Sequence, residues 1–160
     1  MDSSILNALS CIDNILSDGE IFKTSIINTI DTSEHRYLEA FEEAKVEYER
    51  IRNDINDVKS ISTNIDAEIE EVIRVKEHVF FDSHTKKYGD GRIEYGRLDE
   101  DPEIVNAWDR LSQNNHVSSD MDFFRHESYE SNLVRTEGMV YNDAHERTVA
   151  AGLTWYPGGE

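Results

Sequence analysis

The sequence predicts a mainly all-α fold, in which a long N-terminal helical hairpin or coiled coil precedes a small helical C-terminal module. No proline precedes Pro102 and no glycine occurs between Gly19 and Gly89, so this stretch lacks the residues that interrupt helices. Apolar residues in it recur at spacings of three and four, as on one face of a helix. The pattern ends where polar, glycine-bearing sequence begins. We therefore divide the chain into a helical rod over 1–81 and a C-terminal module over 82–160.

Two short helices are expected at the start of the rod. The first begins at Ser3 or Ser4, whose hydroxyls suit an N-cap, and ends after Leu16. The second runs from Ile21 to Ile30. An Asp-Thr-Ser-Glu sequence with capping-box spacing follows and predicts that a new helix starts there.

The clearest pattern is a heptad repeat in the second half of the rod. Apolar positions, with only Ser62 polar, alternate spacings of three and four: Phe41, Ala44, Tyr48, Ile51, Ile55, Val58, Ser62, Ile65, Ile69 and Val72. Such a repeat is typical of coiled coils. One helix from Glu34 to His78 would be roughly 67 Å long at about 1.5 Å per residue. Its apolar stripe needs a partner, either the two N-terminal helices folded back or a second copy of the chain, and replacing Ile55 by Asp is expected to disrupt both arrangements.

The C-terminal module combines a candidate turn with helix signals. The Asp90-Gly91 pair could turn a short β-hairpin, and we treat 88–96 as a loop with strand character, because an isolated hairpin is marginally stable. Three helices are expected: one begun by Asp101 as N-cap with Pro102 in its first turn, one from Ser118, Ser119 or Asp120 through Leu133 with Gly138 at a left-handed C-cap, and one capped by Asn142 and ended by Gly152.

The charge of the chain excludes some functions. It has 16 Lys and Arg against 34 Asp and Glu, a formal net charge of −18. Non-specific nucleic-acid affinity comes largely from basic side chains that displace counterions, so nucleic acid is not expected as a passive ligand. No apolar run is long enough to span a membrane, and the N-terminus lacks a Sec-type signal. The single cysteine, Cys11, cannot form an internal disulfide and is not expected to be catalytic.

The densest cluster of reactive side chains is His126, Glu127 and Glu130 on one expected helix and His145 on the next. Residues three or four apart share a helix face, and a short turn at Gly138 would bring the second helix alongside the first. We predict these four as catalytic residues, because two imidazoles and two carboxylates suit acid–base hydrolysis or the binding of one divalent cation. The cofactor stays unassigned, with a divalent metal as the candidate.

Two alternatives to this site stay open. In a purely structural one, the two histidines make buried polar contacts that fix the helix pair, while Glu127 and Glu130 face water. The sequence is also not the His-Glu-x-x-His pattern of zinc proteases, because position 130 is Glu. A separate pair, Arg110 and His116, resembles the Arg-x4–6-His signature of the helical ribonucleases of the HEPN group, which is short enough to occur by chance.

Three segments carry a further resemblance. They are His126-Glu127-x-x-Glu130-x-x-Leu133-Val134, Gly138-Met139-x-Tyr141-x-x-Ala144-His145, and Trp155-Tyr156-Pro157-Gly158. Over about 120–157 the chain resembles the C-terminal module of some bacterial polymorphic toxins, and its N-terminal helices are similar to the targeting regions of type VII-exported effectors. The resemblance implies functional roles for His126, Glu127, Glu130 and His145, an immunity protein as partner, and a bacterial cytoplasmic location with export by a non-Sec route.

Two classes of function follow. The first is a polymorphic-toxin-like effector whose C-terminal module is a hydrolase or nuclease acting through the His/Glu cluster. The second is a non-enzymatic acidic protein, either an immunity or antitoxin-like partner or a coiled-coil adaptor, since a surface dense in carboxylates steers quickly onto a basic protein. In either class a protein partner is expected, or self-association through the coiled coil.

Overall fold

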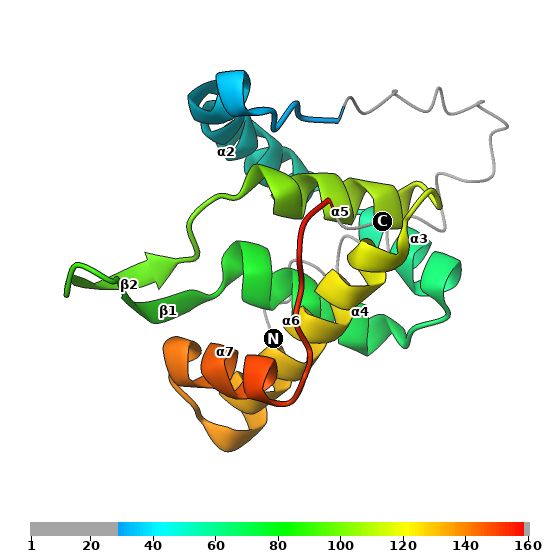
Figure 1. Ribbon diagram of the computed structural model, residues 1–160. Coiled ribbons are helices and arrows are strands. Elements are labelled where there is room, and N and C mark those ends of the chain that lie inside the picture. The colour runs from blue at the N-terminus through cyan, green and yellow to red at the C-terminus, as the bar shows by residue number, and fades with distance from the viewer. Residues whose placement is uncertain (1–28, 159–160) are drawn as a thin grey trace, which may run out of the picture.

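The computed structural model describes residues 29–158, which form a mainly helical molecule with one small antiparallel sheet (Figure 1). Its elements, after a short 3-10 turn at Glu34–Arg36, are α2 (Tyr37–Asn53), α3 (Asp57–Ile65), α4 (Ile69–Lys76) with a π-helical turn at Glu77–Phe81, β1 (Ser83–Lys87), β2 (Ile93–Arg97), α5 (Pro102–Ser112), α6 (Ser118–Glu137) and α7 (Tyr141–Ala150). The two helices expected before residue 29, and with them the hairpin they would form, lie outside the described residues. No helix within 29–158 is long and apolar enough to cross a membrane.

The prediction of one helix from Glu34 to His78 is wrong, because the segment is broken twice. The first break follows Asn53, where the backbone of Asp54 is extended and its carboxylate accepts hydrogen bonds from the backbone N–H groups of Asn56 (2.8 Å) and Asp57 (3.3 Å). Such a side-chain turn competes with helix continuation. The second break is at Asp66, which adopts a left-handed conformation with φ 54°.

The heptad pattern nevertheless identifies much of the buried face. Tyr48, Ile51, Val58 and Val72 are buried, each from one of the three shorter helices. Ile55 lies in the first break and is 42% exposed, so its replacement by Asp is no longer expected to disrupt packing. The stripe is therefore covered within the chain by helices that turn back on themselves.

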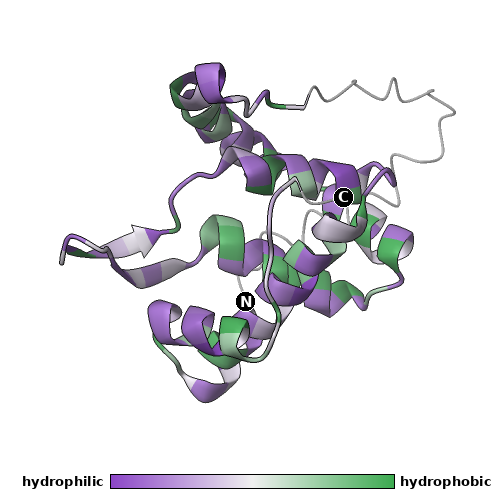
Figure 2. Ribbon diagram, in the orientation of Figure 1, coloured by the Kyte–Doolittle hydropathy of each residue, from purple (hydrophilic) through white to green (hydrophobic). Residues whose placement is uncertain are grey.

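The hydrophobic core is built from the helices that precede the hairpin in the sequence and from those that follow it. It joins α2, α3 and α4 to α5 and α6, and Figure 2 shows hydrophobic and hydrophilic residues alternating around these helices. At its centre the ring of Phe80 lies against those of Tyr48 (4.8 Å between centroids) and Trp108 (5.3 Å), both edge to face. Such aromatic pairs stabilise a core by about 0.5–1.5 kcal/mol beyond their area burial.

A buried ion pair joins the first helix break to α4 and α5. The Lys76 ammonium lies 2.7 Å from Asp57 Oδ1 and donates to the backbone carbonyl of Asp54 at 2.8 Å. The indole N–H of Trp108 donates to the other oxygen of Asp57 at 2.8 Å. Both charged groups are therefore paired and hydrogen-bonded, as burial requires.

The C-terminal helices follow the predicted boundaries closely. Asp101 caps α5 by accepting from the N–H of Glu103 at 2.8 Å, with Pro102 in the first turn. Gly138 ends α6 in the left-handed conformation at φ 67°. Asn142, in contrast, does not cap α7 but bonds the backbone N–H and carbonyl of Lys87, which ties α7 to β1.

The remaining features frame the site. A β-hairpin is present over 83–97, wider than the segment 88–96 for which we expect a loop with strand character. Ser83 lies opposite Arg97 and Lys87 opposite Ile93, so the strands flank the Asp90-Gly91 turn. After α7 the chain runs back across α6 toward α5 (Figure 1). There the ring of Trp155 packs 4.9 Å from that of Phe123.

Candidate functional site

The structure brings the four sequence-predicted site residues together. His126, Glu127 and Glu130 lie on the buried side of α6, and α7 packs against this helix after the turn at Gly138. The rings of His126 and His145 are 4.9 Å apart between centroids. A spacing of four along α6 puts His126 beside Glu130, which is the arrangement expected for a helix.

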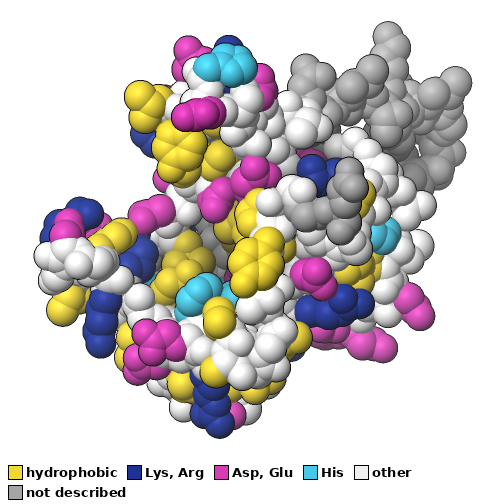
Figure 3. All heavy atoms as spheres, in the orientation of Figure 1, with side chains coloured by type: hydrophobic (Ala, Val, Ile, Leu, Met, Phe, Trp, Pro, Cys, Tyr) yellow, Lys and Arg dark blue, Asp and Glu magenta, His cyan; other side chains and the backbone are white. Residues whose placement is uncertain are grey.

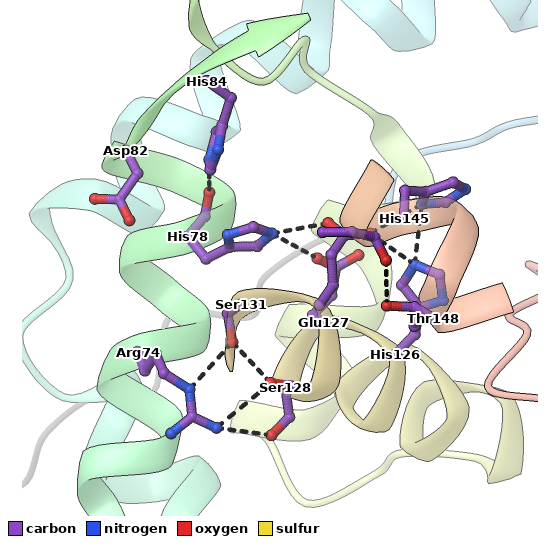
Figure 4. A network of polar contacts seen from close by, with 12 residues as sticks. Arg74, His78, Asp82, His84, His126, Glu127, Ser128, Ser131, His145 and Thr148 are labelled. Atoms are coloured by element: carbon purple, nitrogen blue, oxygen red, sulfur yellow. Dashed lines mark hydrogen bonds and ion pairs between the residues drawn. The ribbon is translucent and has the colours of Figure 1, made fainter. Parts of the chain in front are cut away.

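Glu130 is the hub of the cluster. Its Oε2 lies 2.9 Å from His145 Nδ1 and 3.2 Å from His126 Nε2, and its Oε1 accepts a hydrogen bond from His78 Nε2 at 2.8 Å. Figure 4 shows the three imidazoles converging from the turn after α4, from α6 and from α7. Glu130 is 1% exposed, so this carboxylate is satisfied almost entirely by histidines rather than by water.

The protonation of His126 is set by a backbone carbonyl. Its Nδ1 is 2.7 Å from the oxygen of Leu153, in the segment after α7. Because a carbonyl oxygen only accepts, Nδ1 carries the hydrogen. The Nε2 atom, which faces Glu130 Oε2 and also lies 3.2 Å from His145 Nδ1, is left as the reactive nitrogen of the ring.

Burial and the charges of the cluster shift the pKa values of its members. Burial opposes ionisation of Glu130, but hydrogen bonds from His126, His145 and His78 outweigh it and hold the pKa of this carboxyl well below its usual range. The same contact with Glu130 raises the pKa of His145, and raises that of His126 in spite of burial. Burial, reinforced by the negative charge of Glu130, raises the pKa of Glu127 to about 8.

The cluster opens onto a cleft of about 280 Å³. Its lining is Asp101, Ile104, His126, Glu127, Tyr141, His145, Val149, Thr154, Trp155 and Tyr156. No Lys or Arg is among these residues of the described chain. Figure 3 shows histidine side chains at the surface beside hydrophobic ones in the middle of this face. The site is thus reachable from solvent, and its walls are aromatic, aliphatic and acidic.

One carboxylate oxygen in the cluster lacks a partner. Glu127 Oε2 is buried and hydrogen-bonds to no residue within 29–158, its nearest imidazole nitrogen being His78 Nε2 at 3.8 Å. Buried polar atoms are nearly always satisfied, so an unpartnered one needs an explanation such as a catalytic role or a bound ion or water.

The structural alternative is wrong in one of its two parts. It had Glu127 and Glu130 facing water, but they are 7% and 1% exposed. The buried polar contacts it expected for His126 are present. His145 is instead exposed over 47% of its side chain.

Two sets of donor atoms could hold a metal ion. One consists of His126, Glu130 and His145, and the other of His78, Glu127 and Glu130, with the donor atoms of each set within 4.8 Å of one another. Glu130 belongs to both, and only the first set reaches the cleft through two of its members.

Sequence reasoning missed several contributors. His78 lies in the π-helical turn, and its signal was a lone histidine in the apolar run around Val79 and Phe80. The contact of Leu153 with His126 is made by its backbone carbonyl, so the type of side chain at this position gives no signal for it. In the Arg110–His116 pair, Arg110 donates two hydrogen bonds to the carboxylate of Asp120 (2.7 and 2.8 Å).

Comparisons of this chain with protein-family models, with curated proteins and with solved structures gave no match.

Proposed function

We propose that this chain is a hydrolase whose active site is the His/Glu cluster of α6 and α7. One observation carries the proposal: the imidazoles of His126 and His145 line an open cleft together with Glu127, whose carboxyl has an oxygen without a hydrogen-bond partner within 29–158. Hydrolysis needs a group that takes a proton from water and neighbours that hold that water in place. The buried carboxylate of Glu130 hydrogen-bonds to both imidazoles and holds them in place.

Glu127 is the residue we assign to proton transfer. Its side chain lines the cleft, and its Oε2 hydrogen-bonds to no other residue in the described range, so we assign this carboxyl to a water bound in the cleft. Burial raises the pKa of Glu127 to about 8, so its ionised form is a stronger base than an ordinary carboxylate. The water loses its proton to this ionised form as its oxygen attacks the substrate carbon. The same proton then passes to the leaving group, which balances the reaction.

The walls of the cleft favour an uncharged or cationic substrate. Its charged side chains are the carboxyl groups of Asp101 and Glu127 together with the histidines, and the described lining offers no Lys or Arg to a phosphate. Phosphoryl-transfer sites combine such basic side chains with metal ions to neutralise the phosphate, and a metal ion alone would leave the phosphate facing the carboxyl groups of this lining. Ile104, Val149 and the aromatic residues of the lining would cover an apolar group. We therefore propose an amide or ester substrate rather than a phosphodiester.

The biological setting is proposed on the resemblance to polymorphic toxins. In that setting the hydrolase acts on a competing bacterium and a dedicated immunity protein protects the producer. The acidic net charge of −18 supports a second candidate, a binding protein for a basic partner. The two candidate functions make different predictions, because only the hydrolase needs the side chains of His126 and Glu127 for its activity.

The test compares matched variants in a growth assay and in vitro. We expect induction of the chain in bacteria to slow growth, and His126→Ala or Glu127→Gln to abolish this effect. His35→Ala and Glu70→Gln, both at exposed positions away from the cluster, serve as controls. Circular dichroism of the purified variants checks that they fold.

The in vitro arm uses fluorogenic esters, peptides and phosphodiesters. Turnover of an ester or peptide by the parent and the controls, with none by Glu127→Gln, supports the proposal. Activity that survives in folded His126→Ala and Glu127→Gln overturns it. If no substrate is turned over and the chain binds a basic protein in a salt-sensitive way, the binding function takes its place.

A further inference from the structure

We propose that α6 and α7 form a binding site for one divalent transition-metal ion, with His126 Nε2, Glu130 Oε2 and His145 Nδ1 as ligands and a fourth position open to the cleft. Zn²⁺ is the first ion to test, since two histidines and one glutamate with an open position form a known type of catalytic zinc site. The inference deepens the proposed hydrolase and rests on it only for what the ion does.

The spacing of the three donor atoms suits a tetrahedral ion. They form a triangle with sides of 2.9 Å (Glu130 Oε2 to His145 Nδ1), 3.2 Å (Glu130 Oε2 to His126 Nε2) and 3.2 Å (His126 Nε2 to His145 Nδ1). Zn–N and Zn–O bonds of about 2.0–2.1 Å at tetrahedral angles put neighbouring ligands about 3.3 Å apart. A small outward movement of the side chains would therefore complete the site.

The protonation of the three donor groups is compatible with an ion between them. The carbonyl of Leu153 fixes the hydrogen of His126 on Nδ1, so the neutral ring directs a lone pair from Nε2 into the triangle. The ionised carboxylate of Glu130 also offers only lone pairs. Without an ion, protons on His126 Nε2 and His145 Nδ1 are shared with Glu130 Oε2. A metal ion would displace these protons and accept the three lone pairs at once.

The surroundings of the triangle match those of protein metal ligands. Ligating histidines almost always donate their other ring N–H to a carbonyl or carboxylate, as His126 does to Leu153. Ligating carboxylates are hydrogen-bonded in turn, and His78 donates to Glu130 Oε1, which leaves Oε2 for the ion. His78 itself is held through its backbone carbonyl, which accepts from His84 Nε2 at 3.0 Å.

The second donor set is the weaker of the two. It would use His78 as a ligand, yet His78 Nδ1 is buried and, among the residues the structure describes, has no hydrogen-bond partner to fix the ring. Its Nε2 is already committed to Glu130 Oε1. All three members, His78, Glu127 and Glu130, are also buried, so no open coordination position would face a substrate. We therefore assign one ion, not two.

Glu127 provides an independent sign of a ligand. Its side chain is 9% exposed and lines the cleft beside His126 and His145, while its buried Oε2 has no hydrogen-bond partner within 29–158. A carboxylate in this position accepts a hydrogen bond from a water bound to the ion. A metal lowers the pKa of such a water to about 7, which supplies hydroxide for attack near neutral pH.

The experiment measures metal binding by the full chain, without an affinity tag that contains histidine. After removal of metal with a chelator, Zn²⁺ is titrated calorimetrically and bound zinc is counted by elemental analysis. We expect one Zn²⁺ per chain, and at least about tenfold weaker binding in His145→Ala, which removes a ligand. His145 is the variant of choice because its exposed position lets the fold survive.

The controls separate the two donor sets. His35→Ala tests a histidine outside the cluster, and it should bind as the parent does. Glu127→Gln removes a carboxylate that contacts the water but not the ion, and it too should keep one Zn²⁺. Co²⁺ in place of Zn²⁺ should give the intense visible absorption of a four-coordinate site in the parent, and lose it in His145→Ala.

Several outcomes would overturn the assignment. The site is wrong if the parent binds no zinc, if His145→Ala binds as tightly as the parent, or if two ions bind per chain. Loss of zinc in Glu127→Gln but not in His145→Ala would move the ion to the second set. Zinc bound as assigned without any hydrolysis would refute the hydrolase alone. Hydrolysis that continues in protein freed of zinc would refute the part of the ion in the reaction, whereas the binding site itself is refuted only by the titrations.

Discussion

At the scale of single residues, the candidate site depends on how Glu130 distributes its two oxygens. One is held by His78 and the other meets His126 and His145. The meeting of His126, Glu127, Glu130 and His145 could be predicted from the sequence, because helical spacing and a short turn at a glycine determine it. His78 could not, since its position depends on a helix break and a π-helical turn that periodicity does not reveal.

A buried carboxylate far from the site gives a prediction on pH. Burial raises the pKa of Asp109 to about 6, although Arg50 lies 2.7 Å away and opposes the shift. A carboxyl whose pKa is higher in the folded state binds more protons there, so stability falls as pH rises between its unfolded and folded values. The parent should therefore lose on the order of 2–3 kcal/mol relative to Asp109→Asn between about pH 4 and pH 6, and nothing further above.

Urea unfolding of both proteins from pH 4 to pH 8 measures this difference. Asp122→Asn, at an exposed position of α6, is the control and should show no such slope against the parent. A stability difference between the parent and Asp109→Asn that stays constant, or that grows in favour of the parent with pH, contradicts the predicted sign.

At the scale of elements, the sequence pattern identified buried positions better than helix continuity. The heptad spacing selects Tyr48, Ile51, Val58 and Val72 correctly as core residues. Periodicity indicates which side of a helix is apolar. A break after which the apolar residues continue at the same spacing leaves the periodicity unchanged and is therefore not visible in the sequence pattern. Here the turn made by the Asp54 carboxylate and the left-handed Asp66 interrupt the helix without disturbing the pattern.

The pair of Lys76 and Asp57 holds these shorter helices in place, which gives a second prediction. Lys76→Met leaves the Asp57 carboxylate buried with Trp108 as its remaining side-chain donor. Removing one partner of a buried ion pair costs about 3–5 kcal/mol. We expect a loss of that size in the free energy of unfolding, measured in urea, against almost none for Lys59→Met at an exposed position of α3. Adding Asp57→Asn should restore part of the loss, and a double variant as unstable as the single one would refute the explanation.

The turn between α6 and α7 gives a third prediction. Gly138 has φ 67°, and a Cβ added there would meet no atom within 4 Å, so the cost of a side chain is conformational and not steric. Gly138→Ala should destabilise the protein by about 1 kcal/mol. Gly89→Ala, where no positive φ is required, should change stability less. Thermal unfolding measures both, and equal effects would show that the left-handed turn is not what sets the geometry of the helix pair.

At the scale of the whole molecule, net charge and local pairing act in opposite directions. Ion pairs such as Arg135 with Glu77 (2.6 Å) and Arg110 with Asp120 (2.7 Å) are short-range attractions. The formal net charge of −18 adds repulsion between carboxylates that are much farther apart. Such repulsion opposes the compact state.

Salt distinguishes these two contributions, because screening weakens distant charges first. The Debye length falls from about 30 Å at 0.01 M to about 8 Å at 0.15 M, still longer than a contact pair. We therefore expect Tm at pH 7 to rise when NaCl is raised from 10 to about 150 mM, as repulsion is screened and the pairs persist. At pH 4.6, the isoelectric point of the sequence, net repulsion vanishes and the rise should disappear. A Tm that falls with salt at pH 7, or rises equally at both pH values, would mean that the local pairs, or effects of the salt unrelated to charge, dominate the stability of this fold.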